Sequence, residues 1–546
     1  MVIGMTLNRT ASTRCEKVQA FPALVMALFE QSGLTRLIDS RFDIDPRIKL
    51  TPGNAVKALV GNMFTSEGRR PIYNVSHPFL SAPVDLMFGP KVDVGALGGR
   101  AFDRNLDRLF GINLPELHHD CYSLITSRYH LDSNLYNLDS TNFTIHSLDV
   151  TADRDGAAVP EWCGHAKDGH DERLVYTLLS MTDENGIVCY EKPYDGSTSD
   201  QEMDADAIRY LSEKVDASTS TIVADCKIAT QPLVDLLFEH DFGFVTKCPD
   251  NYGNKVRSDI VYSVSTGTMD PSMVRDGWSI YDTDAEVDGR MLRFVAFRTS
   301  GDISAGVEFH REQDLKEAES KFRRFSSKTF NCDIDARRAV DEALKGMSNN
   351  AYDVEWGVEP VEVSLGYGHR GRPRKSEVPK VRTEYRVNVK LTFNEERAVA
   401  LSQDRDVRVL ITNIPRANED SENIRFGATA DTVLKTYLGQ YRIEHGFRLM
   451  KDGMGMDRVY LHKPSRENAM MFVIALATTI SDVIHVVLTS KGIDHTAEDL
   501  AGRMTTLTLI HDRERDEEIL DGPEALQDLF IDCIEALDID SDHILH

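Results

Sequence analysis

Three acidic residues, far apart in the sequence, have the types and settings that metal-assisted chemistry needs. Asp139 stands inside an apolar, strand-like segment, Asp225 ends a second one, and Glu444 lies in a helical segment. A carboxylate in an apolar strand is costly to bury without a partner, and a divalent cation is a natural partner. Two Mg²⁺ ions ~3.5–4 Å apart, held by carboxylate oxygens, can activate one oxygen and stabilise another in phosphoryl transfer. The three acids therefore predict a metal-dependent phosphoryl-transfer site.

Structural roles would explain each acid separately. Asp139 could accept hydrogen bonds from turn backbone, and Asp225 could cap the helix that follows it. Glu444 could pair with Arg448 at i,i+4 on a solvated helix face, a contact worth ~0.2–0.5 kcal/mol. For one aspartate alone this interpretation is as good as catalysis, but three acids in suitable settings favour a common site.

The segment 437–451 around Glu444 has the pattern of one continuous helix. At ~100° per residue, its polar side chains fall on a single stripe that consists of Tyr437, Gln440, Glu444, Arg448 and Lys451. A neighbouring apolar stripe, expected to face a core, consists of Ile443, Phe447, Met450 and Met454. The acid is thus expected among a phenol, an amide and two cations.

The elements that would carry the two aspartates form a mixed α/β sheet. Strands are predicted at 135–146, 175–181, 187–194, 220–225 and 242–246, and helices at 205–215 and 232–239. The second and third strands are separated by a turn and are expected to be antiparallel. Three strands, then helix, strand, helix and strand, is the order of a ribonuclease-H-like fold, so the fold class is α/β (α+β).

The predicted secondary structure and the composition change along the chain and divide it into five segments. We expect a helical N-terminal domain at 1–130, for DNA binding or dimerisation, and the first part of the catalytic core at 131–250. A β-rich insertion domain follows at 251–427, then the closing helices of the core with Glu444 at 428–491, and acidic C-terminal helices at 492–546. Nothing in the first segment specifies chemistry, so it could also be a simple helical cap.

The composition describes a folded chain with an unusual charge. Hydrophobic residues make up 41% and charged residues 27% of the 546 residues, as in soluble globular proteins. The formal net charge of −26 alone argues against a polyanionic partner. Binding to DNA depends on local cationic patches, however, so the total charge does not exclude it.

Location follows from cysteine usage and hydropathy. The eight cysteines are scattered without a C-x-x-C pair, and no charged N-terminal segment precedes an apolar run. The mostly apolar segment 469–488 contains Asp482 and His485, which favours a buried core helix over a membrane span. We therefore expect reduced thiols, a cytoplasmic protein and no membrane association.

One short basic segment lies inside the predicted insertion. Its cations are Arg370, Arg372, Arg374 and Lys375. The Arg-Gly-Arg-Pro sequence within it resembles the core of an AT-hook, which enters the minor groove of DNA. A basic flexible linker is the alternative, and either one is a local cationic patch.

The acids and their neighbours resemble the DDE transposases of bacterial and archaeal insertion sequences, in the branch with a Y-R-E-K signature. Tyr437, Glu444 and Lys451 match the spacing Y-x₂-R-x₃-E-x₆-K, whereas Gln440 takes the place of the arginine. Arg442 or Arg448 could supply that charge. Other segments resemble the 1634-type family and together extend from about residue 40 to 490; they include 139–141, 164–168, 196–200, 223–225, 447–451 and 458–462.

The resemblance implies a cut-and-paste transposase that acts as a homodimer on DNA in the nucleoid of a prokaryotic cell. Asp139, Asp225 and Glu444 would bind two Mg²⁺ (or Mn²⁺) ions. They would catalyse hydrolysis at inverted-repeat ends of double-stranded DNA, then attack of the freed 3′-hydroxyl on target DNA. The residues expected to hold DNA are Tyr437, Arg448, Lys451, Lys167, Arg442, Arg370 and Arg372.

Two other functions remain open at this point. A ribonuclease-H-like nuclease would hydrolyse DNA without joining it, and a domesticated derivative would bind DNA without cutting. The intact acids argue against the second. We expect cations to cluster along one channel, with DNA binding that weakens steeply with salt; they are Arg370, Arg372, Arg374, Lys375, Arg442, Arg448, Lys451, Arg458 and Lys463.

Overall fold

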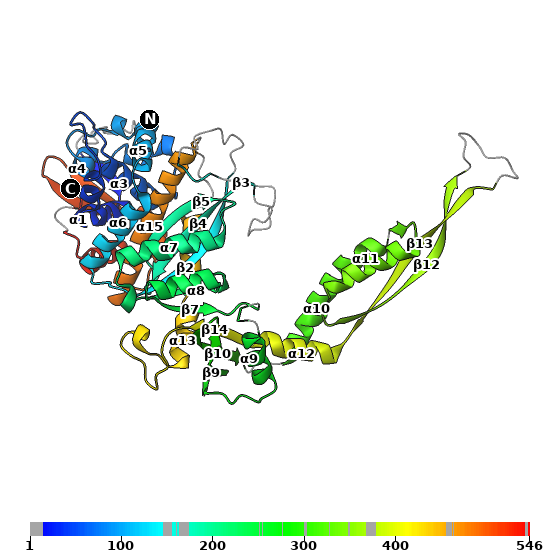
Figure 1. Cartoon of the computed structure of the whole chain (residues 1–546). Helices are drawn as coiled ribbons and strands as arrows, with labels where there is room; N and C mark the ends of the chain where they lie inside the picture. The colour runs from blue at the N-terminus through cyan, green and yellow to red at the C-terminus, as the bar shows by residue number, and fades with distance from the viewer. Residues whose placement is uncertain are drawn as a thin grey trace, which may run out of the picture. The chain divides into compact units, whose positions relative to one another are not determined.

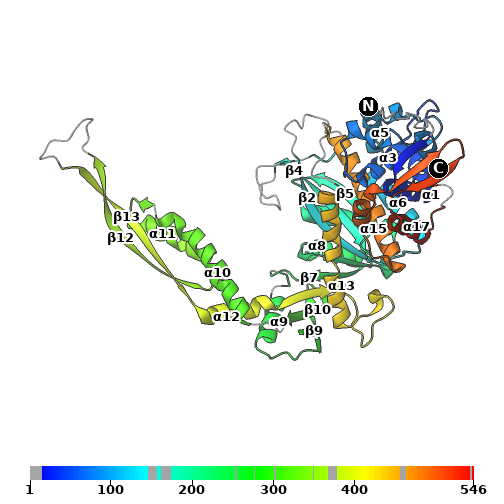
Figure 2. The same cartoon turned by 180° about the vertical axis from the view of Figure 1, so that it is seen from behind.

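The computed structural model of this chain forms two compact units (Figures 1 and 2). The first consists of Met1–Thr246 with Asn413–His546, and the second is Lys247–Thr412. The structure describes residues 15–145, 156–159, 161–162, 174–250, 252–253, 255–275, 277–299, 303–326, 328–347, 350–366, 378–454, 461, 463–540 and 544–545.

A mixed sheet forms the centre of the first unit, and β2 (Leu135–Ile145) is its middle strand. On one side β4 (Leu174–Asp183) pairs antiparallel with β2, and β5 (Val188–Asp195) and the short β3 (Glu161–Trp162) pair antiparallel with β4. On the other side β6 (Thr221–Ala224) runs parallel to β2, and β7 (Gly243–Lys247) parallel to β6. The predicted strands and the antiparallel pairing of β4 with β5 are confirmed.

Helices cover both faces of this sheet. On one face lie α7 (Asp200–Lys214) and α8 (Gln231–Glu239), in front of the strands in Figure 1, and α14 (Tyr441–Arg448) packs against β2 and β4 on the other. Tyr210 of α7 packs on Tyr190 of β5 with ring centres 4.6 Å apart. The helix α7 begins five residues before the predicted start because Ser199 caps it, its hydroxyl accepting from the Glu202 N–H.

The long helix α15 (Pro464–Ser490) is the core helix of the first unit (Figure 2). It is long and apolar enough to cross a membrane by length and composition, yet 83% of its apolar window is buried inside the protein. It packs against α3 (Pro52–Met63), α5 (Gly99–Phe110) and α6 (Leu114–Arg128). Among the described residues it behaves as the predicted buried helix.

The N-terminal helices begin with α1 (Ala20–Gln31) and α2 (Leu34–Asp39), and a short α4 (Val84–Phe88) follows α3. Thr51 caps α3, since its Oγ1 accepts from the Asn54 N–H at 3.3 Å. Preceding α1 is a strand, β1 (Cys15–Gln19), which a purely helical N-terminal segment does not contain.

The C-terminal segment is not purely helical, and that prediction was wrong. Besides α16 (Ala497–Arg503) and α17 (Glu524–Ala536) it contains a hairpin of β15 (Thr508–Asp512) and β16 (Glu517–Asp521). The strand β15 also pairs antiparallel with β1, so the two ends of the chain share one small sheet. Alternate side chains of β15 are buried, as expected for a half-buried strand. Its partner β1 lies almost 500 residues away in the sequence, so no local pattern predicts that pairing.

The second unit has two parts. One is an antiparallel sheet in the order β14 (Arg408–Thr412), β10 (Arg290–Thr299), β9 (Trp278–Val287) and β8 (Met273–Arg275), with α9 (Val256–Ser265) nearby. The other packs α10 (Ile303–Phe322), α11 (Asp333–Lys345) and α12 (Glu395–Asp406) with the strands β11 (Thr329–Phe330), β12 (Tyr352–Gly366) and β13 (Lys380–Phe393).

Candidate active site

Asp139 and Asp225 lie level on two neighbouring strands. Leu138 of β2 is the register partner of Ala224 of β6. The next residues along the two strands, Asp139 and Asp225, therefore lie side by side. Asp225 still has extended backbone, with φ −69° and ψ 172°. Adjacent strands lie ~4.8 Å apart, and level residues of a parallel pair point to the same face. The pairing therefore brings both carboxylates to one face of the sheet, where β6 ends.

Asp225 is not the helix cap that the structural interpretation expects. Its carbonyl accepts from Thr246 Oγ1 at 2.9 Å and from the Ile228 N–H at 3.2 Å. Its half-buried carboxylate makes no side-chain cap and has no hydrogen bond or ion pair with any described residue. Asp139, also half-buried, accepts from the Ser140 N–H at 2.7 Å. An unpartnered half-buried carboxylate beside a second one suits a cation site.

The segment that follows Glu444 lies over the same face of the sheet. Phe143 is on the face of Asp139, because side chains alternate along β2 and the two residues are four positions apart. The ammonium of Lys451 lies 5.1 Å from the centre of the Phe143 ring, a cation–π contact. The third acid thus belongs to a segment that crosses the face of the two aspartates.

The predicted continuous helix through 437–451 was wrong. The structure has α13 (Ala430–Leu438), a turn at Gly439 and Gln440, then α14, and a π-helical turn at Leu449–Gly453. At the break the N–H groups of Arg442 and Ile443 bond three residues back, to Gly439 and Gln440. Glycine is a poor helix former, which favours the break there. Tyr437 and Glu444 therefore lie on different helices, and the single polar stripe does not exist.

The apolar stripe was predicted correctly. All four of its members are buried, namely Ile443, Phe447, Met450 and Met454. Through this face α14 packs against β2 and β4. Its first turn is tied to the β4–β5 turn, because the Arg442 guanidinium donates to the Glu184 carbonyl. Arg442 is thereby partly committed to the protein and not to a partner molecule.

Glu444 is exposed and forms no hydrogen bond or ion pair within the described part of the chain. The i,i+4 pair with Arg448 is absent there, since Arg448 Nη2 instead lies 2.7 Å from His445 Nδ1. Partial burial, and then the charge of Arg448, hold the pKa of His445 below its ordinary value. His445 is thus favoured in its neutral form, which can accept from the guanidinium, and the Glu444 carboxylate stays available.

The described residues contain no group of three His, Cys, Asp or Glu side chains at metal-binding distance. The structure therefore brings Asp139 and Asp225 together but does not bring the Glu444 carboxylate to them at that distance. The two aspartates by themselves fit a hard divalent cation, because they offer only carboxylate oxygens from one face and that of Asp225 has no partner in the described part of the chain.

Known proteins resemble most of this chain. A family model described as "Transposase DDE domain" matches residues 132–480, which is more than half of the chain. The chain belongs to this family of DDE transposases. Residues 14–122 of the transposase match a second model, described as a domain of unknown function, DUF4277. No curated protein matches this chain.

Solved structures resemble this transposase only weakly, as one example shows. It is the cryo-EM structure of the piggyBac transposase synaptic complex with hairpin DNA, with 11% sequence identity and a TM-score of 0.37. The similarity covers 96% of this chain and 88% of that chain. At that TM-score it does not establish a shared fold. The expectation of a DDE transposase is confirmed by the family, whereas the Y-R-E-K branch stays a prediction.

Several predicted DNA-binding positions lie outside the described residues. These are Lys167 with the motif 164–168, the cations of the AT-hook-like segment (Arg370, Arg372, Arg374 and Lys375), and Arg458. Of the remaining ones, Tyr437 is half-buried at the end of α13, and Lys463 is exposed just before α15. The predicted channel is therefore described only in part.

Lys227 is a residue near the site that sequence reasoning missed. Its ammonium lies 3.0 Å from Asp200 Oδ2 and 3.5 Å from Ser140 Oγ. Burial alone would lower the pKa of Lys227, but the hydrogen bond and charge of Asp200, then the charge of Asp139, raise it above its ordinary value. Two features of the sequence could have pointed to Lys227. It follows Asp225 by two residues, and its partner Asp200 belongs to the segment 196–200, which resembles the family but had been given no role.

A buried glutamate lies in line with Asp139 across the sheet. Ser180 of β4 is the register partner of Asp139 on one side and of Glu191 of β5 on the other. Glu191 is fully buried, and its Oε2 has no hydrogen-bond partner among the residues that are described. Burial raises the pKa of Glu191 to about 8. A neutral acid thus lies on the sheet face that carries Asp139, two strands away from it.

Proposed function

We propose that this chain is a transposase that cuts DNA at the inverted-repeat ends of an insertion sequence and joins the freed 3′ ends to target DNA. The observation that carries the proposal is the level placement of Asp139 and Asp225 on β2 and β6, within a chain of the DDE transposase family. The strand order β5-β4-β2-β6-β7, with β6 and β7 parallel to β2 and β4 antiparallel to it, supports a ribonuclease-H-like core.

Asp139 and Asp225 would hold divalent metal ions, two Mg²⁺ or Mn²⁺, with Glu444 as the third carboxylate. Such ions, when bound, activate the attacking oxygen and stabilise charge on the leaving oxygen. The protein's own contribution is to hold the scissile phosphate against this face. Lys451, seated over Phe143, offers a cation there for the charge that develops during transfer.

Glu444 needs to approach the two aspartates for this arrangement. Its helix is short and bounded by the Gly439–Gln440 turn on one side and the π-helical turn on the other. Both interruptions are places where a helix can shift, and π-turns occur frequently at functional sites. The exposed carboxylate of Glu444 has no contact to give up among the described residues. We infer that bound DNA and metal ions complete the site.

The finer assignments follow the resemblance to the Y-R-E-K branch. Tyr437 and Lys451 would contact the transposon end, with Arg448 nearby, and Gln440 occupies the signature arginine position. The protein would act as a homodimer on double-stranded DNA, in the prokaryotic cytoplasm. The segment 251–427 would be an insertion domain, and Lys167, Arg370 and Arg372 would add DNA contacts.

The test uses the purified full chain, a labelled DNA duplex carrying the element's inverted repeat, a target plasmid and Mg²⁺. The expected result is cleavage at the repeat end followed by covalent joining of the labelled strand to the plasmid. Cleavage without joining would replace the proposal by a hydrolytic nuclease. Binding without cleavage, in Mg²⁺ and in Mn²⁺, would leave a DNA-binding derivative.

A further inference from the structure

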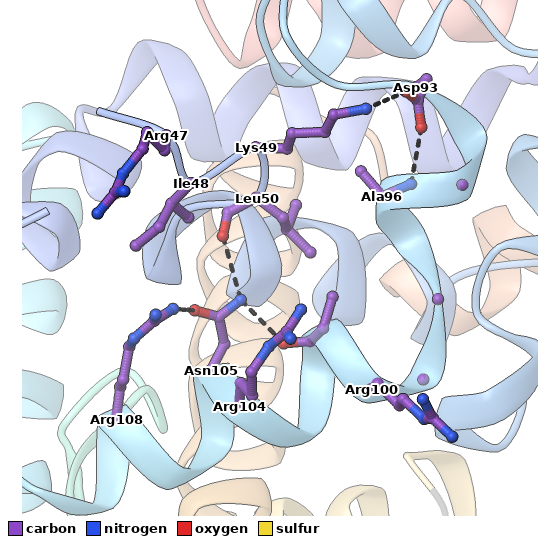
Figure 3. A pocket seen from close by; sticks show the side chains of 14 residues that line it. Arg47, Ile48, Lys49, Leu50, Asp93, Ala96, Arg100, Arg104, Asn105 and Arg108 are labelled. Atoms are coloured by element: carbon purple, nitrogen blue, oxygen red, sulfur yellow. Dashed lines mark hydrogen bonds and ion pairs between the residues drawn. The ribbon is translucent and has the colours of Figure 1, made fainter. Parts of the chain in front are cut away.

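The N-terminal segment that matches the domain of unknown function contains a pocket of about 710 Å³ (Figure 3). Residues 47–50, the loop before α5 and the α5 helix form its walls. Five of the side chains that line it are basic and one, Asp93, is acidic; the basic ones are Arg47, Lys49, Arg100, Arg104 and Arg108. In a chain of net charge −26, this is a local concentration of positive charge.

The charges of α5 are sorted between its two sides. Arg100, Arg104 and Arg108 follow at intervals of four residues, so they form one row, and all three line the pocket. The helix also carries Asp103 and Asp107, but both pair with Arg466 of α15, at 3.1 and 2.7 Å. The acids of α5 are thus neutralised away from the pocket.

No carboxylate of the described residues neutralises the arginine row. Arg100 and Arg104 are exposed and form no hydrogen bond or ion pair there. Arg108 Nη1 donates to Asn105 Oδ1 at 3.0 Å. Asn105, which is buried, donates in turn to the Leu50 carbonyl at 3.2 Å and the Ala101 carbonyl at 3.1 Å, so it holds one wall of the pocket and Arg108 together.

The other two cations already have partners at the rim. Lys49 pairs with Asp93 at 2.5 Å, and Arg47 pairs with Asp45 at 2.5 Å. The N-terminal end of α5 also borders the pocket, because Gly98, Gly99 and Arg100 line it and Gly98, at the N-cap, has no side chain to accept from the first N–H groups. The available positive charge is therefore the arginine row and the helix end beside it, a combination that suits phosphate groups.

The length of the arginine row suits a chain of several phosphates. With a rise of ~1.5 Å per residue, the three arginines extend over ~12 Å of helix. One strand of B-DNA carries a phosphate every ~3.4 Å along its axis, so this length faces about three phosphates. The pocket lining contains no aromatic side chain on which an unpaired base could stack, and its one amide, Asn105, is committed to the protein.

We propose that this pocket binds the phosphodiester backbone of double-stranded DNA without reading its sequence, as a second DNA contact apart from the face of Asp139 and Asp225. The inference rests on the proposed function, because it takes DNA as the partner. It gives the domain of unknown function a physical role, namely to bind a DNA duplex that the rest of an acidic chain would repel.

The test compares two triple variants of the full chain with equal charge. One is Arg100→Gln/Arg104→Gln/Arg108→Gln, and the control is Lys491→Gln/Arg503→Gln/Arg515→Gln, at exposed positions outside the pocket. Affinity for a labelled 30-base-pair duplex of arbitrary sequence is measured by fluorescence anisotropy at several salt concentrations. We expect at least about 10-fold weaker binding for the pocket variant and a salt slope smaller by about 2–3, at ~0.9 per phosphate contact, with little change in the control.

Equal affinities and equal slopes for the two triple variants would overturn the inference. A single-stranded competitor that displaces the duplex at equal concentration would also overturn the assignment to duplex DNA. The single variant Arg100→Gln removes an exposed side chain without a partner among the described residues, so it keeps the fold and should lower the slope by about one. If the wild-type chain binds DNA through the pocket but never cleaves it, the proposed function fails and this inference survives.

Discussion

The ammonium of Lys451 lies 5.1 Å from the centre of the Phe143 ring, and Phe143 is on the same face of β2 as Asp139. This contact places the segment that carries Glu444 across the face where Asp139 and Asp225 lie level. It also positions a cation on the face of the two acids, where the phosphate of a bound DNA strand would lie in the proposed reaction.

Replacing Lys451 by methionine keeps the aliphatic contact with Phe143 and removes the charge. We expect the rate of DNA cleavage to fall about 10²-fold, the loss typical of one group that stabilises developing charge. Lys214→Met is the matched control, since Lys214 makes a similar cation–π contact with Tyr210, 5.6 Å away, on the face covered by α7. Equal rates for both variants would exclude Lys451 from the site.

Metal binding should be visible as thermal stabilisation. Mn²⁺ at about 100 times its Kd should raise the free energy of unfolding of the wild-type chain by ~2.7 kcal/mol, because it binds only the folded state. The Asp139→Asn/Asp225→Asn variant should lose this stabilisation, and Asp528→Asn, at an exposed position of α17, should keep it. The measurement is the melting temperature with Mn²⁺ and with chelator.

Glu191 predicts a specific pH dependence of stability. Its pKa is about 8 in the folded chain, against 4.5 ordinarily, because burial disfavours the charged form. The folded state therefore holds a proton that the unfolded state has lost, and stability falls as pH rises from about 4.5 to about 8.

The variant Glu191→Gln should remove that loss, because an amide does not ionise in either state. Its melting temperature should therefore exceed that of the wild type by more at a pH of about 8.5 than at a pH of about 5. Glu213→Gln, at an exposed position of α7, is the control and should show no such difference. A difference between Glu191→Gln and wild type that does not change with pH would contradict the buried-acid account.

Gln440 occupies the position of the signature arginine, at the N-cap of α14. If this position faces the transposon end, Gln440→Arg should tighten binding to inverted-repeat DNA several-fold and raise the salt slope by about one. Gln527→Arg, on α17, adds the same charge elsewhere and should have a smaller effect. Equal effects of the two variants would mean that Gln440 does not contact the end.

The strands were predictable because their signals are local. The alternation in β2, the turn between β4 and β5, and the apolar run before Asp225 all lie within a few residues. The hairpin of β15 and β16 was missed because its sheet is completed by β1 from the opposite end of the chain. Pairing between such distant segments leaves no periodicity in either one.

The candidate site shows the same limit. The sequence supplied the three acids, but the level placement of Asp139 and Asp225 depends on the register of β2 with β6, which is a long-range property. The break at Gly439 was missed because Tyr437, Gln440 and Glu444 keep helical spacing across it, and the apolar stripe from Ile443 to Met450 keeps it across α14 and the π-helical turn. Local periodicity therefore predicted the buried side of this segment but not the direction of Glu444.

The central claim is that Asp139 and Asp225 catalyse DNA cleavage and joining together. The most direct measurement is the strand-transfer rate with labelled end DNA and Mg²⁺ for Asp139→Asn, Asp225→Asn and the exposed control Asp528→Asn. The account predicts that each of the first two loses at least about 10³-fold in rate, ~4 kcal/mol of transition-state stabilisation, while still binding DNA, and that the control keeps its rate. Strand transfer by Asp139→Asn at the wild-type rate would contradict the account.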